Sequence, residues 1–239
     1  MKITVFNGSP RGERGNTYIM AEAFLQGAKK TGAEVEHILL VKKNINHCMG
    51  CFSCWSKTPG KCVINDDMAV LLDKYINSDI VIYASPLYTD FVTGLMKDFL
   101  DRVLPIVCPE FEKEGSGESR HKRRYAKYPD LIMMSNCGFP EGRQFETLRL
   151  FCKRKMRNDK ANVIAEIYRS QGELLKSEDP NMKPLVESYK GLLRKAAGEI
   201  VMGRKILPDT LAELEKPLIP EEEYFRAVNE GWQQMKSHD

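Results

Sequence analysis

The sequence predicts a doubly wound α/β fold, in which five parallel strands in the order 2-1-3-4-5 form a sheet with helices on both faces. Three observations support this prediction. Short apolar segments alternate with segments of helical periodicity along the chain. Residues 79–84 are almost all apolar, which is typical of a central parallel strand covered on both faces. The 239 residues contain no internal repeat and no change in composition, so one domain spanning 1–239 is expected.

The first strand is expected at residues 2–6, where alternation gives way to an apolar run. After a turn rich in glycine, Asn16 or Thr17 is expected to cap a helix that ends at Gly32. A second strand is expected at 35–41. This strand–helix–strand unit is parallel and right-handed by default, and it sets the hand of the sheet.

The cysteine segment, residues 44–66, then interrupts the alternation as an insertion. Asp66 or Asp67 is expected to cap the helix that follows it, rather than to form a catalytic carboxylate pair. The later elements resume the alternation. They are strands at 79–84, 131–134 and 162–168, and helices at 95–103, 144–157, 185–202 and 221–235.

Two further stretches are expected to lack regular structure. Residues 110–129 are polar and charged, which predicts a long surface loop. The prolines between 207 and 220 predict an irregular crossing at the start of a C-terminal extension, residues 207–239.

The charge and hydropathy of the chain exclude several classes of function. A net charge of +3 provides no strong field, so a nucleic-acid partner is not expected. No segment approaches the roughly 20 apolar residues of a membrane span. The first residues run directly into a strand without a signal-peptide layout, so a cytoplasmic location is expected.

Three irregular loops are expected to meet at one edge of the sheet. Ligands of open parallel sheets bind beyond the carboxyl ends of the strands, where the strand order reverses. Strands 1, 3 and 4 are neighbours in the predicted order. We name the loops that follow them the first loop (7–17), the second loop (85–91) and the third loop (135–141).

The first loop has the composition of a phosphate site. Ser9 and Thr17 offer hydroxyl groups, Asn16 an amide and Arg11 a guanidinium, and the helix behind them directs free N–H groups towards an anion. The loop matches neither the dinucleotide-binding fingerprint nor the P-loop. A polar turn with a helix cap is the alternative interpretation.

The second and third loops suit a planar ring. Pro86, Leu87 and Tyr88 offer apolar and aromatic surface, and the backbone near Thr89 can meet the edge of a heterocycle. The third loop adds residues to the same rim, namely Cys137 and Gly138. The alternative is an ordinary strand end with core aromatics, and for Cys137 a small structural residue.

Four cysteines in the cysteine segment have the spacing C-x2-C-x2-C-x7-C. They are Cys48, Cys51, Cys54 and Cys62. The first three match the run that binds a [4Fe-4S] cluster in ferredoxins, whereas the last interval is longer. A zinc site with four thiolates and a set of free reduced thiols remain open beside the cluster.

These motifs together resemble a known family. Asn7-Gly8-Ser9-Pro10-Arg11 with Gly15-Asn16-Thr17, then Ser85-Pro86-Leu87-Tyr88, resemble the NAD(P)H-dependent FMN reductase branch of the flavodoxin-like superfamily. Cys137-Gly138-Phe139-Pro140-Glu141 is similar to its third flavin loop. The resemblance implies a flavodoxin-like sheet with FMN. The FMN phosphate would lie on Ser9, Arg11, Asn16 and Thr17, and its ring would lie against Pro86, Leu87, Tyr88 and Thr89, with Gly138 on the far side.

The cysteine segment is similar to that of iron–sulfur flavoproteins. The family therefore implies an FMN-dependent NAD(P)H oxidoreductase that passes hydride to flavin and then to a quinone or other small acceptor, with no catalytic side chain. The alternative is an electron carrier that exchanges single electrons between FMN, a [4Fe-4S] cluster and ferredoxin. A homodimer or homotetramer is also implied.

Overall fold

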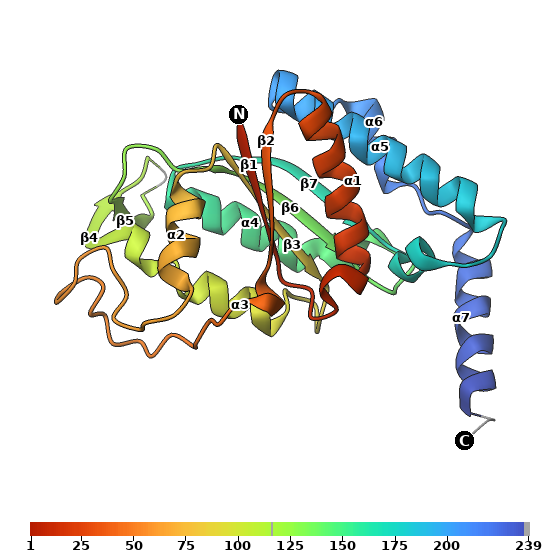
Figure 1. The fold of residues 1–239 in the computed structure, drawn as a ribbon, viewed down its shortest axis with the longest axis horizontal. Helices are drawn as coiled ribbons and strands as arrows, with labels where there is room; N and C mark the ends of the chain where they lie inside the picture. The colour runs from red at the N-terminus through yellow and green to blue at the C-terminus, as the bar shows by residue number, and fades with distance from the viewer. Residues whose placement is uncertain (116, 237–239) are drawn as a thin grey trace.

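A five-stranded parallel sheet forms the centre of the molecule. The computed structural model describes residues 1–115 and 117–236 (Figure 1). The strand order is β2-β1-β3-β6-β7, which confirms the predicted order with β6 and β7 as its fourth and fifth strands. The bounds of these strands are β1 Lys2–Asn7, β2 Glu34–Leu39, β3 Ile80–Pro86, β6 Asp130–Asn136 and β7 Val163–Arg169.

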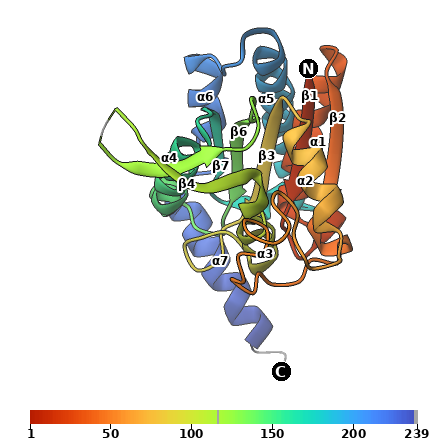
Figure 2. The ribbon, with the colours of Figure 1, turned by 90° about the vertical axis from the view of Figure 1, so that its left-hand side faces the viewer.

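Helices cover both faces of the sheet (Figures 1 and 2). Alternate side chains of a strand point to opposite faces, so each central strand contributes to two cores. On β3, Ile80 and Ile82 pack under α1 and α5, whereas Val81 and Tyr83 pack under α2, α3 and α4. The bounds are α1 Asn16–Lys30, α2 Met68–Ile76, α3 Gly94–Asp101, α4 Glu146–Asp159 and α5 Met182–Gly203.

The stretch predicted as a long loop, 110–129, instead contains most of an antiparallel hairpin. Its strands are β4, Val107–Lys113, and β5, Ser119–Arg123. Arg120 pairs across it with Glu112 at 3.0 Å and with Glu114 at 3.1 Å. The prediction was wrong because charge pairs, rather than an alternation of apolar residues, accompany this hairpin. Ser116 in this stretch lies outside the described residues.

The C-terminal extension also differs from the expectation. A short helix, α6 (Pro208–Glu215), occupies much of the stretch predicted as irregular, with its proline in the first turn, where the missing N–H costs nothing. Arg169 at the end of β7 donates hydrogen bonds to the carbonyl oxygens of Leu214 and Lys216 at 2.8 and 2.6 Å. The last three residues of the extension, 237–239, lie outside the described residues.

Helix α7, Glu221–Lys236, projects beyond the rest of the molecule (Figures 1 and 2). Tyr224 in its first turn is its buried residue. Short 3-10 turns complete the described chain: η1 Gly12–Arg14, η2 Leu40–Lys42, η3 Leu104–Ile106, η4 Gly142–Phe145 and η5 Gly172–Lys176. None of the described helices has the length and apolar character needed to cross a bilayer.

Candidate functional site

The first, second and third loops meet in one cavity at the carboxyl ends of β1, β3 and β6. Nine of the ten residues predicted to bind a cofactor line it, namely Ser9, Arg11, Asn16, Thr17, Pro86, Leu87, Tyr88, Cys137 and Gly138. Its volume is about 70 Å³. A recess of that size receives one end of a ligand, and the larger part of a flavin would extend over its rim.

Close backbone packing shapes the first loop. A Cβ on Gly8 would lie 2.7 Å from Cβ of Met96, and one on Gly15 would lie 2.5 Å from Oγ of Ser9. Gly12 has a φ of +54°, in the left-handed region that favours glycine. The loop therefore needs glycine at these positions to bring its backbone against α3 and around Ser9.

The first turn of α1 offers donors to an anion in this cavity. Gly15 stands at the N-cap, so no side chain there satisfies the first N–H groups of the helix. Asn16 and Thr17 are 5% and 1% exposed. Oδ1 of the Asn16 amide is buried without a hydrogen-bond partner among the described residues; because an amide oxygen accepts, a hydroxyl or N–H group of a ligand would supply that partner, whereas an anion would not.

Hydrogen bonds between the loops fix their relative positions. Oγ1 of Thr93 donates to the Gly8 carbonyl at 2.6 Å, and the N–H of Thr93 donates to Oγ of Ser85 at 3.1 Å. Nδ2 of Asn136 donates to Oγ1 of Thr17 at 2.7 Å, which joins the third loop to the first. These bonds join groups of the protein alone, so they pre-organise the cavity.

Two lining residues were not predicted from the sequence. Asn136 lies in the third loop, directly before Cys137. Its polar side chain at the end of a strand could have identified it as a lining residue. Glu173 lies after β7 and carried no signal, because only the fold brings it to Arg11, whose Nη1 lies 3.2 Å from its Oε1. Both side chains of this ion pair are more than half exposed, so the Arg11 guanidinium is accessible from solvent.

Thr89 is the predicted residue that does not line the cavity. It lies at the tip of a tight turn closed by reciprocal backbone hydrogen bonds between Tyr88 and Phe91 at 2.9 and 3.0 Å. Thr89 and Asp90 both have positive φ, at +48° and +57°, which is uncommon for residues other than glycine. Their N–H groups have no hydrogen-bond partner among the described residues, so they are available to a ligand above the rim.

Cys137 faces the cavity as a neutral thiol. Its side chain is buried, and burial raises the pKa of the thiol to about 11. A thiolate is the reactive form of cysteine, so this position has little nucleophilic character at neutral pH. The neighbouring Gly138 carbonyl accepts a hydrogen bond from Oη of Tyr224 at 2.8 Å, which connects α7 to the rim of the cavity.

The four cysteines of the cysteine segment line a second, small and mostly apolar cavity. Cys48 and Cys51 are exposed, Cys62 is half-buried and Cys54 is buried, and all four are free thiols. Among the described residues, no three metal-binding side chains lie close enough to hold a single metal ion. The cavity that the four thiols line has a volume of about 20 Å³.

The aromatic ring of Trp55 holds this segment against the body of the protein. Its Nε1 donates to the carbonyl oxygens of Val107 at 3.0 Å and Leu104 at 3.3 Å. It stacks on Phe52 and lies against His121 of the hairpin. The segment itself contains no helix or strand between Lys43 and Asp67.

Arg102 and Asp66 form a buried ion pair beside the cysteine cavity. Their side chains are 1% and 0% exposed, and Nη1 and Nη2 of Arg102 contact the two carboxylate oxygens at 2.8 and 3.0 Å. Asp66 also accepts the N–H groups of Asn46 at 2.9 Å and Met68 at 3.1 Å. Burial opposes its ionisation, but these donors, led by Arg102, lower the pKa of Asp66 to about 2.

The structure thus assigns the capping role to Asp66 of the predicted pair. Asp67 is the N-cap residue by position, but its side chain makes no capping hydrogen bond. Nε of Arg102 is buried, and it has no hydrogen-bond partner among the described residues. The side chain of Arg102 lines the cysteine cavity together with Cys62.

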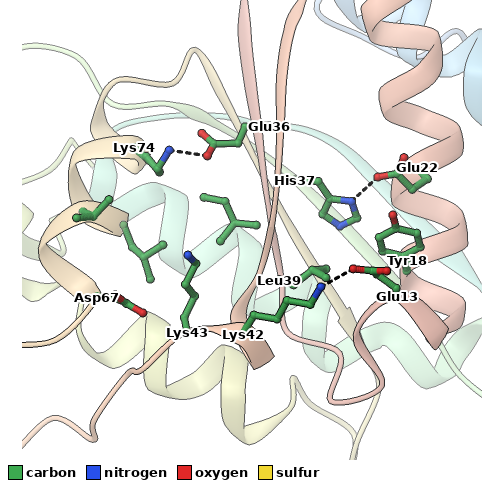
Figure 3. A pocket seen from close by; sticks show the side chains of 13 residues that line it. Glu13, Tyr18, Glu22, Glu36, His37, Leu39, Lys42, Lys43, Asp67 and Lys74 are labelled. Atoms are coloured by element: carbon green, nitrogen blue, oxygen red, sulfur yellow. Dashed lines mark hydrogen bonds and ion pairs between the residues drawn. The ribbon is translucent and has the colours of Figure 1, made fainter.

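A larger, strongly charged cavity lies elsewhere, at the open edge of the sheet (Figure 3). This cavity of about 360 Å³ lies between α1, β2 and α2. Most of its charged side chains already pair with one another, as Lys42 does with Glu13 and Lys74 with Glu36. We therefore place the candidate cofactor site at the three loops.

The sequence matches the model of one protein family. Residues 1–123 match the family described as NADPH-dependent FMN reductase. An iron-sulfur flavoprotein of Archaeoglobus fulgidus is 45% identical over 105 residues, which are 44% of this chain and 46% of that protein. An iron-sulfur flavoprotein of Methanocaldococcus jannaschii is 39% identical over 106 residues, 44% of this chain and 53% of that protein. These matches span about half the length of the curated relatives.

Solved structures share the fold. An FMN-dependent NADH-azoreductase from Bacillus anthracis, in complex with FMN, superposes with a TM-score of 0.60 over 84% of this chain and 99% of its own, at 13% identity. An NAD(P)H:quinone oxidoreductase from Methanothermobacter marburgensis gives a TM-score of 0.61 over 84% and 96%, also at 13% identity. At this identity the likeness extends to the fold, which is flavodoxin-like as the sequence predicts.

Proposed function

The chain belongs to the NADPH-dependent FMN reductase family, and on that premise we propose that it is an FMN-dependent NAD(P)H oxidoreductase. The observation that carries the proposal is the convergence of nine predicted cofactor residues on one cavity at the strand ends. An FMN cofactor is a phosphate joined to a planar ring, and the cavity offers an anion site beside an apolar rim. Two solved neighbours act on NADH or NAD(P)H by name.

The phosphate would be held at the start of α1. The N–H groups of the first helical turn, the hydroxyls of Ser9 and Thr17 and the guanidinium of Arg11 supply donors and positive charge. The unpartnered Oδ1 of Asn16 is an acceptor, so it would take a hydrogen bond from a hydroxyl group of the bound cofactor rather than contact the phosphate. These residues bind and orient; none of them is required to transfer a proton.

The ring would lie over the second loop. Pro86, Leu87 and Tyr88 supply the apolar surface, and the free N–H groups of Thr89 and Asp90 are donors for the polar edge of a heterocycle. Bound FMN supplies the hydride-accepting chemistry between the nicotinamide and a quinone or other small acceptor. The protein contributes placement and N–H dipoles that stabilise negative charge on the ring.

A second function is favoured by the cysteine cavity. We propose that Cys48, Cys51, Cys54 and Cys62 hold a [4Fe-4S] cluster that exchanges single electrons with FMN and a ferredoxin-like partner. Two observations support this proposal: all four thiols line one cavity, and the buried Nε of Arg102, whose side chain lines it too, lacks an acceptor among the described residues. The name of several relatives, iron-sulfur flavoprotein, supports this proposal.

Anaerobic purification followed by a visible spectrum and assays for iron and acid-labile sulfide separates these functions. Flavin bands with rapid NAD(P)H oxidation and no iron support the oxidoreductase alone. Flavin bands with about four irons per chain and negligible NAD(P)H oxidation support the electron carrier. Failure to bind added FMN contradicts both proposals.

The proposal also includes the location, assembly state and partners of the protein. We expect a cytoplasmic homodimer or homotetramer that acts on small molecules and binds neither nucleic acid nor membrane, folded as one domain over residues 1–239. Size-exclusion chromatography with light scattering measures the assembly state.

A further inference from the structure

We propose that His37 is a positioning residue for the FMN site, and that it acts through Asn7 to hold the first loop in its binding conformation. The inference rests on the proposed FMN site, since it assigns a role to a residue that the cofactor does not touch. His37 lies on the edge strand β2, opposite Val5 of β1, with its side chain directed towards α1 (Figure 3).

A chain of side-chain hydrogen bonds runs from α1 to the first loop. Oε1 of Glu22 lies 2.6 Å from Nδ1 of His37, and Nε2 of His37 lies 3.1 Å from Nδ2 of Asn7. Oδ1 of Asn7 in turn accepts the N–H of Ser9 at 2.9 Å. Asn7 is fully buried, so its amide connects the edge cavity to the first loop through the interior of the protein.

The donors and acceptors in this chain fix the protonation state of the ring. The Ser9 N–H can only donate, so the Asn7 oxygen must face it and the Asn7 NH₂ group must face His37. Nε2 of His37 must then accept, which leaves the proton of the neutral ring on Nδ1, where it donates to Glu22. A protonated ring would direct an N–H at the Asn7 NH₂ group, and no orientation of the Asn7 amide satisfies both neighbours.

Two further contacts hold the ring in this orientation. Tyr18 of α1 stacks on His37 with ring centroids 4.9 Å apart and an interplanar angle of 16°. The Asn7 oxygen bonding to the N–H two residues later is an Asx-turn, which sets the direction in which the chain leaves β1. Loss of the His37 acceptor leaves a buried Asn7 donor unpaired and frees this amide to rotate.

The charges around His37 come from each element beside it. Glu22 lies on α1, while Glu13 of η1 pairs with Lys42 of η2. Across the same cavity Glu36 pairs with Lys74 of α2, and Lys43 and Asp67 complete the charged lining. Glu22 is therefore the charged side chain that contacts the ring directly.

The test compares His37→Leu, which removes the acceptor, with His37→Gln, whose amide oxygen can still accept from Asn7. FMN dissociation constants are measured by quenching of flavin fluorescence, and exchange of the Ser9 amide is followed in the FMN-free protein. We expect about tenfold weaker FMN binding and faster Ser9 exchange for His37→Leu, and near wild-type values for His37→Gln.

Rescue by His37→Gln separates this role from a general loss of structure, because this variant restores the acceptor for Asn7 without restoring the imidazole ring. Equal affinities and equal Ser9 exchange in wild type and His37→Leu would overturn the inference. If His37→Leu does not fold, His37→Gln decides: FMN binding and Ser9 exchange near the wild-type values support the inference, and a tenfold loss of affinity in His37→Gln contradicts it. Wild-type protein that binds no FMN contradicts the proposed function, and Ser9 exchange then tests the His37 contact by itself.

Discussion

The two candidate cofactor regions are built in opposite ways. The three-loop cavity lies at the ends of buried strands. Hydrogen bonds of Thr93 and Asn136 join its loops, and one of Asn7 lies within the first loop. The cysteine segment contains no helix or strand, and two of its four cysteines are exposed. It is held to the body by Trp55 and by the ion pair of Arg102 with Asp66. The comparison indicates a pre-organised candidate cofactor cavity and a cysteine segment that relies on a few anchoring side chains rather than on regular secondary structure.

The largest loss of stability is expected when Arg102 is substituted, because its ion pair with Asp66 anchors the cysteine segment. Arg102→Met leaves the Asp66 carboxylate buried without its cation, so we expect a loss of about 3–5 kcal/mol in the free energy of unfolding, measured by urea denaturation. Lys97→Met is the matched control, because Lys97 and Asp101 form an exposed pair worth about 0–1 kcal/mol. Equal losses in the two variants would contradict the anchoring role.

Acid should weaken the same anchor in the wild-type protein. The pKa of Asp66 is lowered to about 2 in the folded state, from about 3.9 in an unfolded chain. Its contribution, about 2 kcal/mol, is therefore present above roughly pH 4 and is lost as the pH falls towards 2. Urea midpoints measured from neutral to acid pH should fall more steeply for wild type than for Asp66→Asn. Parallel curves would show that Asp66 carries no such linkage.

A methyl group on Gly8 should damage the pre-organised region instead. In Gly8→Ala the new Cβ would lie 2.7 Å from Cβ and 3.2 Å from Cα of Met96, so α3 or the first loop must move. We expect a loss of about 2 kcal/mol in stability together with weaker FMN binding, measured by denaturation and fluorescence titration. Gly94→Ala is the control, since no described atom lies within 4 Å of its new Cβ. Unchanged FMN binding in Gly8→Ala would contradict the close packing of the loop.

The smallest effects on stability and on FMN affinity are expected for cysteine substitutions in the two regions. Cys137→Ala removes a buried thiol that stays neutral, because burial raises its pKa to about 11. We expect about 1 kcal/mol of lost stability and FMN affinity within about twofold of wild type. Cys54→Ala, its counterpart in the cysteine segment, should abolish iron binding while FMN binding persists. Loss of flavin in Cys54→Ala would show that the two regions are not independent.

The sequence predicts the sheet well because each strand carries its own apolar signal. The order of the five strands then places the three loops at one edge, so nine of the ten residues predicted to bind a cofactor line one cavity. The hairpin at 107–123 was missed because pairs such as Arg120 with Glu112 form across it and leave no apolar pattern. Glu173 and the Arg102–Asp66 pair were missed because contacts between distant residues have no local signature.

The two tryptophans of the chain occupy contrasting settings in the molecule. Trp55 belongs to the cysteine segment and is half-buried against His121 of the hairpin, whereas Trp232 on α7 is 59% exposed. Their emission should therefore differ in wavelength and in access to a soluble quencher such as iodide. With Trp232→Phe the remaining indole becomes an intrinsic optical reporter of the cysteine segment, and with Trp55→Phe the other reports on the surroundings of the projecting helix.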